Sequence, residues 1–134
     1  MEIIDILKSM LPDNVVLLPP VEESIVKIAS KNPSEFLKRF SYMMQIIKEL
    51  GVVGMFDHAQ IERLKQTDGL GSIHIETRTF NSRILFSIES NDTICLYAFE
   101  KKAGKRKTEY SNYIPIANSI LDKYRKGVYD ESKQ

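Results

Sequence analysis

The sequence predicts a single α+β domain, in which a small antiparallel or mixed sheet carries a pair of helices on one face. Residues 72–107 read as three short strands joined by two tight turns, which is typical of an antiparallel meander. Residues 33–50 carry apolar side chains at intervals of three, four and seven, the pattern of a helix that covers a sheet. With 134 residues, 43% of them hydrophobic and 28% charged, the chain is long enough to bury one core.

Upstream of the meander, the pattern predicts a short helix, a strand and two longer helices. Apolar residues at helical spacing indicate a helix over residues 2–10, and the β-favouring run 15–18 indicates a strand. Two prolines close that strand and suit the start of a helix over residues 21–29, which the helix over 33–50 follows. If the early strand joins the sheet, the element order is (α)-β-α-α-β-β-β-α.

The remaining segments are a connector, a last helix and a tail. Residues 51–71 form the connector, in which residues 59–65 are expected to make one helical turn. The last helix is expected over residues 110–126, with Pro115 in its first turn, where proline is tolerated. The predicted domain spans residues 1–127, and residues 128–134 are expected to be a disordered tail.

One face of the first strand of the meander is expected to carry titratable and charged side chains. In the strand that begins at Ser72, the side chains of His74, Glu76 and Arg78 alternate with apolar ones. The third strand, residues 93–100, is apolar on both faces, as a covered central strand should be.

Composition excludes several classes of protein. Cys95 is the only cysteine and lies in an apolar strand, so a disulfide framework is excluded, a buried inert thiol is expected, and the cytoplasm is the natural compartment. His58 and His74 are the only histidines, which excludes a site built from several histidines, and no phosphate loop or dinucleotide glycine motif is present. No apolar run approaches the ~20 residues of a membrane span.

The basic residues suggest a site for an anion. Residues 71–134 contain 11 Lys and Arg against 8 Asp and Glu, whereas residues 1–70 contain 8 against 10. We expect Arg78 and Arg83 to face each other across the first turn, near Lys101 and Lys102, as a clamp for phosphate. Two other interpretations stay open: the arginines pair with Glu76 or Glu89, and the basic run is a solvated loop.

Four segments together resemble the RelE/HigB superfamily of type II toxin–antitoxin systems, in particular its phage-related, Gp49-like branch. The matching segments are Gly71–Arg78, Ser82–Phe86, Ile94–Lys102 and Ile114–Ala117. The resemblance implies a RelE-like fold and a cytoplasmic endoribonuclease, an mRNA interferase that cleaves mRNA on the ribosome without metal or cofactor. In that reaction the 2′-hydroxyl attacks the adjacent phosphate. The implied partners are mRNA, the ribosome and a cognate antitoxin, a small helix-turn-helix protein.

The candidate residues follow from matching these segments and from side-chain chemistry. The candidate catalytic residues are Arg83, Arg78, Lys102 and His74, and the candidate RNA-binding residues are Lys101, Lys105, Arg106, Lys107, Tyr110 and Tyr113. His74, Tyr110 and Tyr113 are the candidates for proton transfer. Tyr97 and Tyr113 stand where the family often has histidine and glutamate. A non-catalytic binding module, such as the ParE relatives that act on gyrase, is the alternative. As an exposed strand residue, Arg83 is expected to matter for activity and little for stability.

Overall fold

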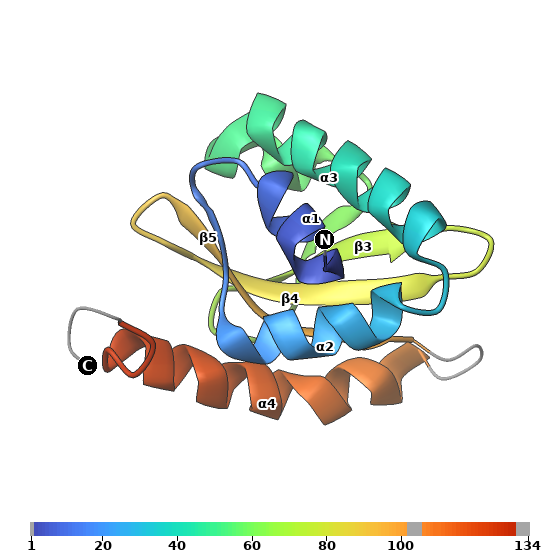
Figure 1. Ribbon diagram of the computed structural model, residues 1–134. Coiled ribbons are helices and arrows are strands. Elements are labelled where there is room, and N and C mark those ends of the chain that lie inside the picture. Colours follow the sequence, from blue (N-terminus) through green and yellow to red (C-terminus); the bar gives the residue numbers. More distant parts are fainter. Residues whose placement is uncertain (1, 102–105, 131–134) are drawn as a thin grey trace.

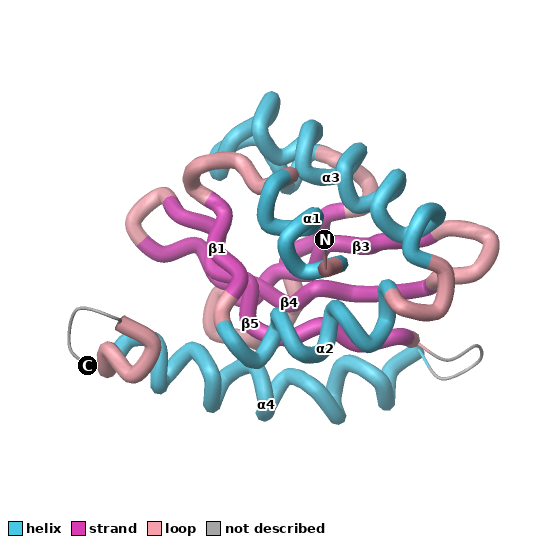
Figure 2. The backbone as a smooth tube through the Cα atoms, in the orientation of Figure 1, coloured by secondary structure: helices cyan, strands magenta, loops and turns pink. Residues whose placement is uncertain are grey.

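We analysed a computed structural model of the chain, which describes residues 2–101 and 106–130, with side chains of the second range from residue 110. The described residues form a five-stranded mixed sheet with the strand order β1-β5-β4-β3-β2 (Figures 1 and 2). β1 pairs parallel with β5, and the other neighbours pair antiparallel. The strands are β1 (Val15–Leu17), β2 (Ile61–Arg63), β3 (Leu70–Glu76), β4 (Asn81–Glu89) and β5 (Asp92–Glu100).

Helices cover both faces of the sheet. They are α1 (Ile3–Ser9), α2 (Pro19–Ala29), α3 (Pro33–Gly54), the 3-10 turn η1 (Met55–Asp57) and α4 (Arg106–Arg125). Figure 1 shows α3 on one side of the sheet and α4 on the other. The α+β class, the mixed sheet and the pair α2–α3 are as predicted, whereas a sheet with helices on only one face is not what the chain forms.

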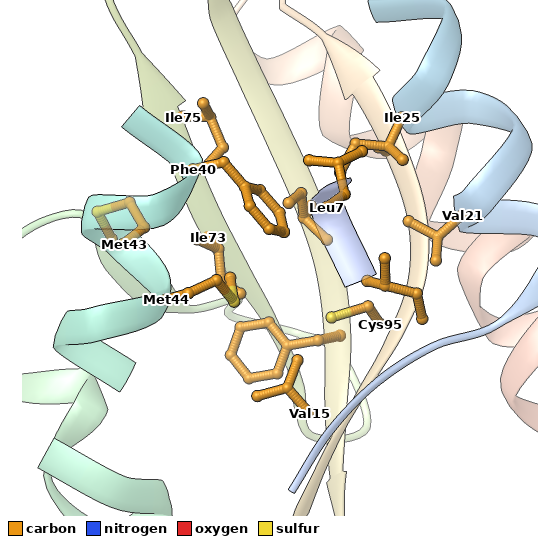
Figure 3. Close-up of a cluster of buried hydrophobic side chains, with 14 of the residues drawn as sticks. Leu7, Val15, Val21, Ile25, Phe40, Met43, Met44, Ile73, Ile75 and Cys95 are labelled. Carbon is orange, nitrogen blue, oxygen red and sulfur yellow. The ribbon is translucent and has the colours of Figure 1, made fainter. Parts of the chain in front are cut away.

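The first face carries the larger core. Ile73 and Ile75 of β3 pack there against α3, together with Leu7 of α1 (Figure 3). Burying each such side chain contributes roughly 1.5–3 kcal/mol. Met43 and Met44 lie in this core as ordinary packing residues, and the buried position predicted for Cys95 is confirmed. Burial raises the pKa of the Cys95 thiol to about 12.

The second face is apolar over only part of its area. Ala117, Ile120 and Leu121 of α4 pack on Leu85 and Leu96 of the sheet. These helical residues all come from the second half of α4. Tyr110, Tyr113 and Ile114 of the first half of α4 also pack against this core, and the Tyr110 hydroxyl reaches the polar side chains of β2 and β3 beside it.

Three boundaries differ from the sequence predictions. Residues 61–63 form strand β2 in place of the predicted helical turn, because Ile61 is buried while its neighbours reach outward. Helix α4 begins at Arg106, so Pro115 lies inside the helix and removes one of its backbone hydrogen bonds. In the predicted tail, Tyr129 packs against the second core, and residues 131–134 lie outside the described part of the chain.

No helix among residues 2–101 and 106–130 is long and apolar enough to cross a membrane.

Candidate functional site

The strand register gathers polar side chains on the sheet face beneath the first half of α4. His74 of β3 stands opposite Arg83 of β4, and Arg83 stands opposite Phe99 of β5. In the next row, Glu62 of β2 stands opposite Ser72 of β3. Alternate residues of a strand share a face, so both rows lie on the face that α4 covers. We call Glu62, Ser72, His74, Glu76, Arg83 and Tyr110 the acid–base cluster.

His74 lies between two carboxylates. Its Nε2 is 2.8 Å from Oε1 of Glu62, and its Nδ1 is 3.2 Å from Oε1 of Glu76. Burial lowers the pKa of His74 below its ordinary value, and the charge of Arg83 lowers it further, so the two carboxylates compensate only in part. The imidazole is therefore neutral at pH 7. We assign the ring proton to Nε2, since the shorter contact is there, which leaves Nδ1 as the proton acceptor.

Arg83 is the most buried charge of the cluster, with only 6% of its surface exposed. Its Nη1 donates to Oδ1 of Asn81 at 2.7 Å and to the carbonyl oxygen of Ser82 at 3.1 Å. Its Nη2 lies 3.2 Å from Oε1 of Glu76. The buried Nε of Arg83 has no hydrogen-bond partner within the described part of the chain. The guanidinium is thus held in one position by the strand that carries it and by one carboxylate.

Tyr110 is the residue that α4 contributes. Its hydroxyl donates to Oε1 of Glu62 at 2.7 Å, lies 3.0 Å from Oγ of Ser72, and lies 3.4 Å from Nε2 of His74. Burial raises the pKa of Tyr110 to about 12, and the neighbouring Glu62 carboxylate adds to this. Burial also opposes ionisation of Glu62, but hydrogen bonds from Tyr110 and His74 outweigh it and lower the pKa of that carboxyl. A charged Glu62 therefore joins a neutral tyrosine to a neutral histidine.

The phosphate clamp predicted from Arg78 and Arg83 is wrong. Because β3 ends at Glu76, Arg78 lies in the exposed turn and does not face Arg83. The alternative left open by the sequence, an ion pair between Arg83 and Glu76, is what the chain forms. Glu89 pairs instead with Arg125, at 2.8 Å between its Oε1 and the arginine Nε. The description of Arg83 as an exposed arginine is also wrong, since only 6% of its surface is exposed.

The other predicted site residues divide into three groups. Lys101 lies beside the cluster, with its Nζ 5.3 Å from the centre of the Tyr110 ring. Tyr113 stacks on Phe99, with ring centres 4.2 Å apart. Lys102 and Lys105 lie outside the described residues, and so do the side chains of Arg106 and Lys107, whose backbone opens α4.

Two members of the cluster escaped the sequence analysis. Glu62 lies in the segment that was interpreted as a helical turn, although Ile61, Glu62 and Arg63 alternate with a strand period. Ser72 was counted only as the start of its strand. Glu62 joins the cluster because β2 pairs with β3, whereas Ser72 shares the face of His74 by alternation along β3.

The cluster is a proton-transfer arrangement with a fixed positive charge. Among the described residues, no group of three or more His, Cys, Asp or Glu side chains is arranged to hold a metal ion.

The chain matches no family model, no curated protein and no solved structure in the comparisons.

Proposed function

We propose that the protein is a metal-independent endoribonuclease that cleaves RNA by 2′-hydroxyl attack on the adjacent phosphate. The observation that carries this proposal is the acid–base cluster, in which a neutral His74 lies within hydrogen-bond range of Glu62 and beside Arg83. Cleavage of this kind requires a proton acceptor, a positive charge and a proton donor in one place. The cluster contains all three.

In the proposed reaction, Nδ1 of His74 takes the proton of the 2′-hydroxyl as its oxygen bonds to phosphorus. The bond from phosphorus to the 5′-oxygen then breaks, and the hydroxyl of Tyr110 gives its proton to that oxygen. His74 restores the proton of Tyr110 from Nε2 through Glu62, which lies 2.8 Å from the imidazole and 2.7 Å from the phenol. The products are a 2′,3′-cyclic phosphate and a 5′-hydroxyl. His74 is left neutral with its proton on Nδ1, and proton exchange with water returns the ring to the Nε2–H form before the next cleavage.

Positive charge has two sources in this proposal. Arg83 acts through its fixed charge and does not grip the phosphate, because its Nη atoms already bind Asn81, Ser82 and Glu76. Lys101 is half-buried at the end of β5 and has its ammonium group above the Tyr110 ring, where it can contact a phosphate oxygen. Fixed cations of this kind stabilise the additional negative charge of the transition state.

Together with its resemblance to toxins of type II toxin–antitoxin systems, this chemistry favours a role as the toxin of such a pair. In this role the substrate is mRNA, read on the ribosome, and the partner is an antitoxin that covers the face around Lys101 and Tyr110. The cellular test is brief induction in bacteria, followed by mapping of RNA 5′ ends. Arrest of translation with new 5′ ends supports the role, and unimpaired growth with intact mRNA contradicts it.

The biochemical test compares two histidines. Purified wild-type protein, His74→Gln and His58→Gln are each incubated with two substrates. One is free single-stranded RNA, with and without a chelator, and the other is translating ribosomes without chelator. His58 is the matched control because it lies outside the cluster, where its Nδ1 accepts the Gln60 backbone amide.

We expect wild type and His58→Gln to give cyclic-phosphate ends that persist in chelator. Cleavage by His74→Gln should fall by a factor of roughly 10²–10⁴, the range for loss of a general base. Absence of cleavage by the folded wild-type protein on both substrates would refute the proposal.

A non-catalytic binding module is the second candidate, and the burial of Arg83 favours it. A guanidinium that is 6% exposed and held by its own strand also fits a purely structural role for the cluster. In that case the protein would bind RNA or a protein target without cleaving it. RNA binding that weakens steeply with salt, unaccompanied by new ends, would distinguish this candidate.

A further inference from the structure

We propose that the groove between α2, the end of β5 and α4 is a subsite that binds a nucleobase of the RNA substrate. This inference rests on the proposed ribonuclease function and deepens it. The groove encloses about 420 Å³, which is within the ~300–1,000 Å³ typical of small-molecule sites. Its walls come from Ser24 and Ile28 of α2, Tyr97 and Phe99 of β5, and Tyr113 of α4.

Aromatic rings form one side of this groove. Tyr113 stacks against Phe99 at 4.2 Å and against Tyr97 at 5.7 Å, measured between ring centres, with interplanar angles of 14° and 23°. The side chains of Tyr97 and Tyr113 are only half-buried. Aromatic side chains that reach the surface in near-parallel stacks are the platforms on which proteins hold unpaired bases. The site therefore suits a flat, polarisable ring.

Charged groups also line the groove. Glu23 and Lys27 of α2 lie 3.8 Å apart between carboxylate oxygen and ammonium nitrogen, and both are largely exposed. Glu100 lies at the end of β5, in an ion pair with Lys31. Carboxylates accept from the N–H groups of a base and ammonium groups donate to its carbonyl or ring nitrogen atoms. The groove thus offers both partners that the edge of a nucleobase requires.

The same aromatic row connects the groove to the acid–base cluster. Phe99, which stacks on Tyr113 in the groove, also meets the ring of Tyr110 edge to face, with ring centres 5.7 Å apart. Phe99 is the β5 partner of Arg83, which in turn is the β4 partner of His74. Two strand spacings of ~4.8 Å place Phe99, one wall of the groove, about 10 Å from His74 along the sheet. A base in the groove therefore belongs to a nucleotide next to the phosphate that the 2′-hydroxyl attacks.

The direct test measures binding of small probes to the wild-type chain. The four nucleoside 5′-monophosphates and ribose 5′-phosphate are titrated by calorimetry, with aromatic NMR signals as a second readout. We expect at least one nucleotide to bind about tenfold or more tightly than ribose phosphate, since stacking contributes that factor per base. Equal affinity for ribose phosphate and all four nucleotides would overturn the inference without the need for any variant.

Variants locate the binding. Tyr97→Leu removes the ring and keeps an apolar side chain, and Tyr97→Phe keeps the ring. Tyr42→Leu is the matched control, because Tyr42 is an exposed tyrosine on α3, outside the groove. We expect nucleotide affinity to fall about tenfold or more in Tyr97→Leu and to be unchanged in the other two. Unchanged affinity in a folded Tyr97→Leu would overturn the assignment to this groove.

RNA cleavage separates failure of this inference from failure of the proposed function. If wild type cleaves RNA, Tyr97→Leu should raise KM about tenfold and leave kcat near the wild-type value, because Tyr97 does not touch the reacting atoms. Cleavage with the same KM in both proteins overturns the subsite and leaves the ribonuclease intact. Nucleotide binding in the groove without any cleavage refutes the ribonuclease and keeps the base site.

Discussion

Replacing Arg83 with alanine should destabilise the protein severely, in addition to any effect on activity. The guanidinium is 6% exposed and makes three polar contacts, to Asn81, to the Ser82 carbonyl and to Glu76. In Arg83→Ala all three partners lose their donor, and the space that the side chain filled is left empty. Alanine also removes the positive charge that stands opposite His74 in the sheet.

The magnitude follows from the burial of each partner. Breaking a fully buried ion pair costs about 3–5 kcal/mol. The side chain of Glu76 is 42% exposed, so water replaces part of what it loses. We therefore expect a decrease of about 2–3 kcal/mol in the free energy of unfolding. In a chain of 134 residues this corresponds to a decrease of roughly 6–15 °C in Tm.

Urea unfolding followed by far-UV circular dichroism measures this loss. Arg78→Ala is the matched control, because Arg78 is an exposed arginine in the turn before β4 and its loss should change stability by less than about 0.5 kcal/mol. Arg83→Lys retains the charge and should fall between alanine and wild type, since lysine cannot reproduce the planar fork. If Arg83→Ala and Arg78→Ala unfold at the same urea concentration, the buried role of Arg83 is wrong.

Two other predictions concern the same sheet. The pKa of His74 is lower in the folded chain than its ordinary value, so the unfolded chain binds more protons as the pH falls through about 6.5, and stability must decrease there. Urea unfolding between about pH 8 and pH 5 should show this decrease in wild type and a flatter profile in His74→Gln, and identical profiles would contradict the lowered pKa of His74. At Gly71, an added Cβ would lie 2.4 Å from the Phe86 ring, so Gly71→Ala should cost about 1–3 kcal/mol. At Gly54 the nearest atom to an added Cβ is 3.5 Å away, so the control variant Gly54→Ala should unfold at or above the wild-type temperature. If calorimetry shows that Gly71→Ala is as stable as wild type, the packing argument is refuted.

Much of the scaffold was predictable because its signals are local. Helical spacing indicated α2 and α3, and the Asn and Ser residues of the second turn indicated a tight reversal. Ser90 and Asn91 do adopt positive φ angles there, of 51° and 70°. Strand alternation also predicted that Cys95 is buried. Each of these features depends on neighbours within a few residues along the chain.

The site was predictable only in part, because proximity across a sheet depends on register. Alternation showed that His74 and Glu76 share a face, and it offered Glu76 as one partner for Arg83. It did not show that Arg83 stands opposite His74, since that pairing depends on where β3 ends and the turn begins. Alternation continued to Arg78 in the sequence, whereas β3 ends two residues earlier, at Glu76, and this difference removes Arg78 from the site.

The sequence by itself determined which side chains lie on the polar face of the meander, His74 among them. Only the tertiary structure decided what surrounds that histidine. Strand β2 contributes Glu62 and helix α4 contributes Tyr110, from positions 12 residues before and 36 residues after His74 in the chain. Such contacts form because α4 packs on Leu85 and Leu96 and thereby holds Tyr110 over the cluster. Periodicity records which face of an element is buried, whereas packing between elements decides which buried faces meet.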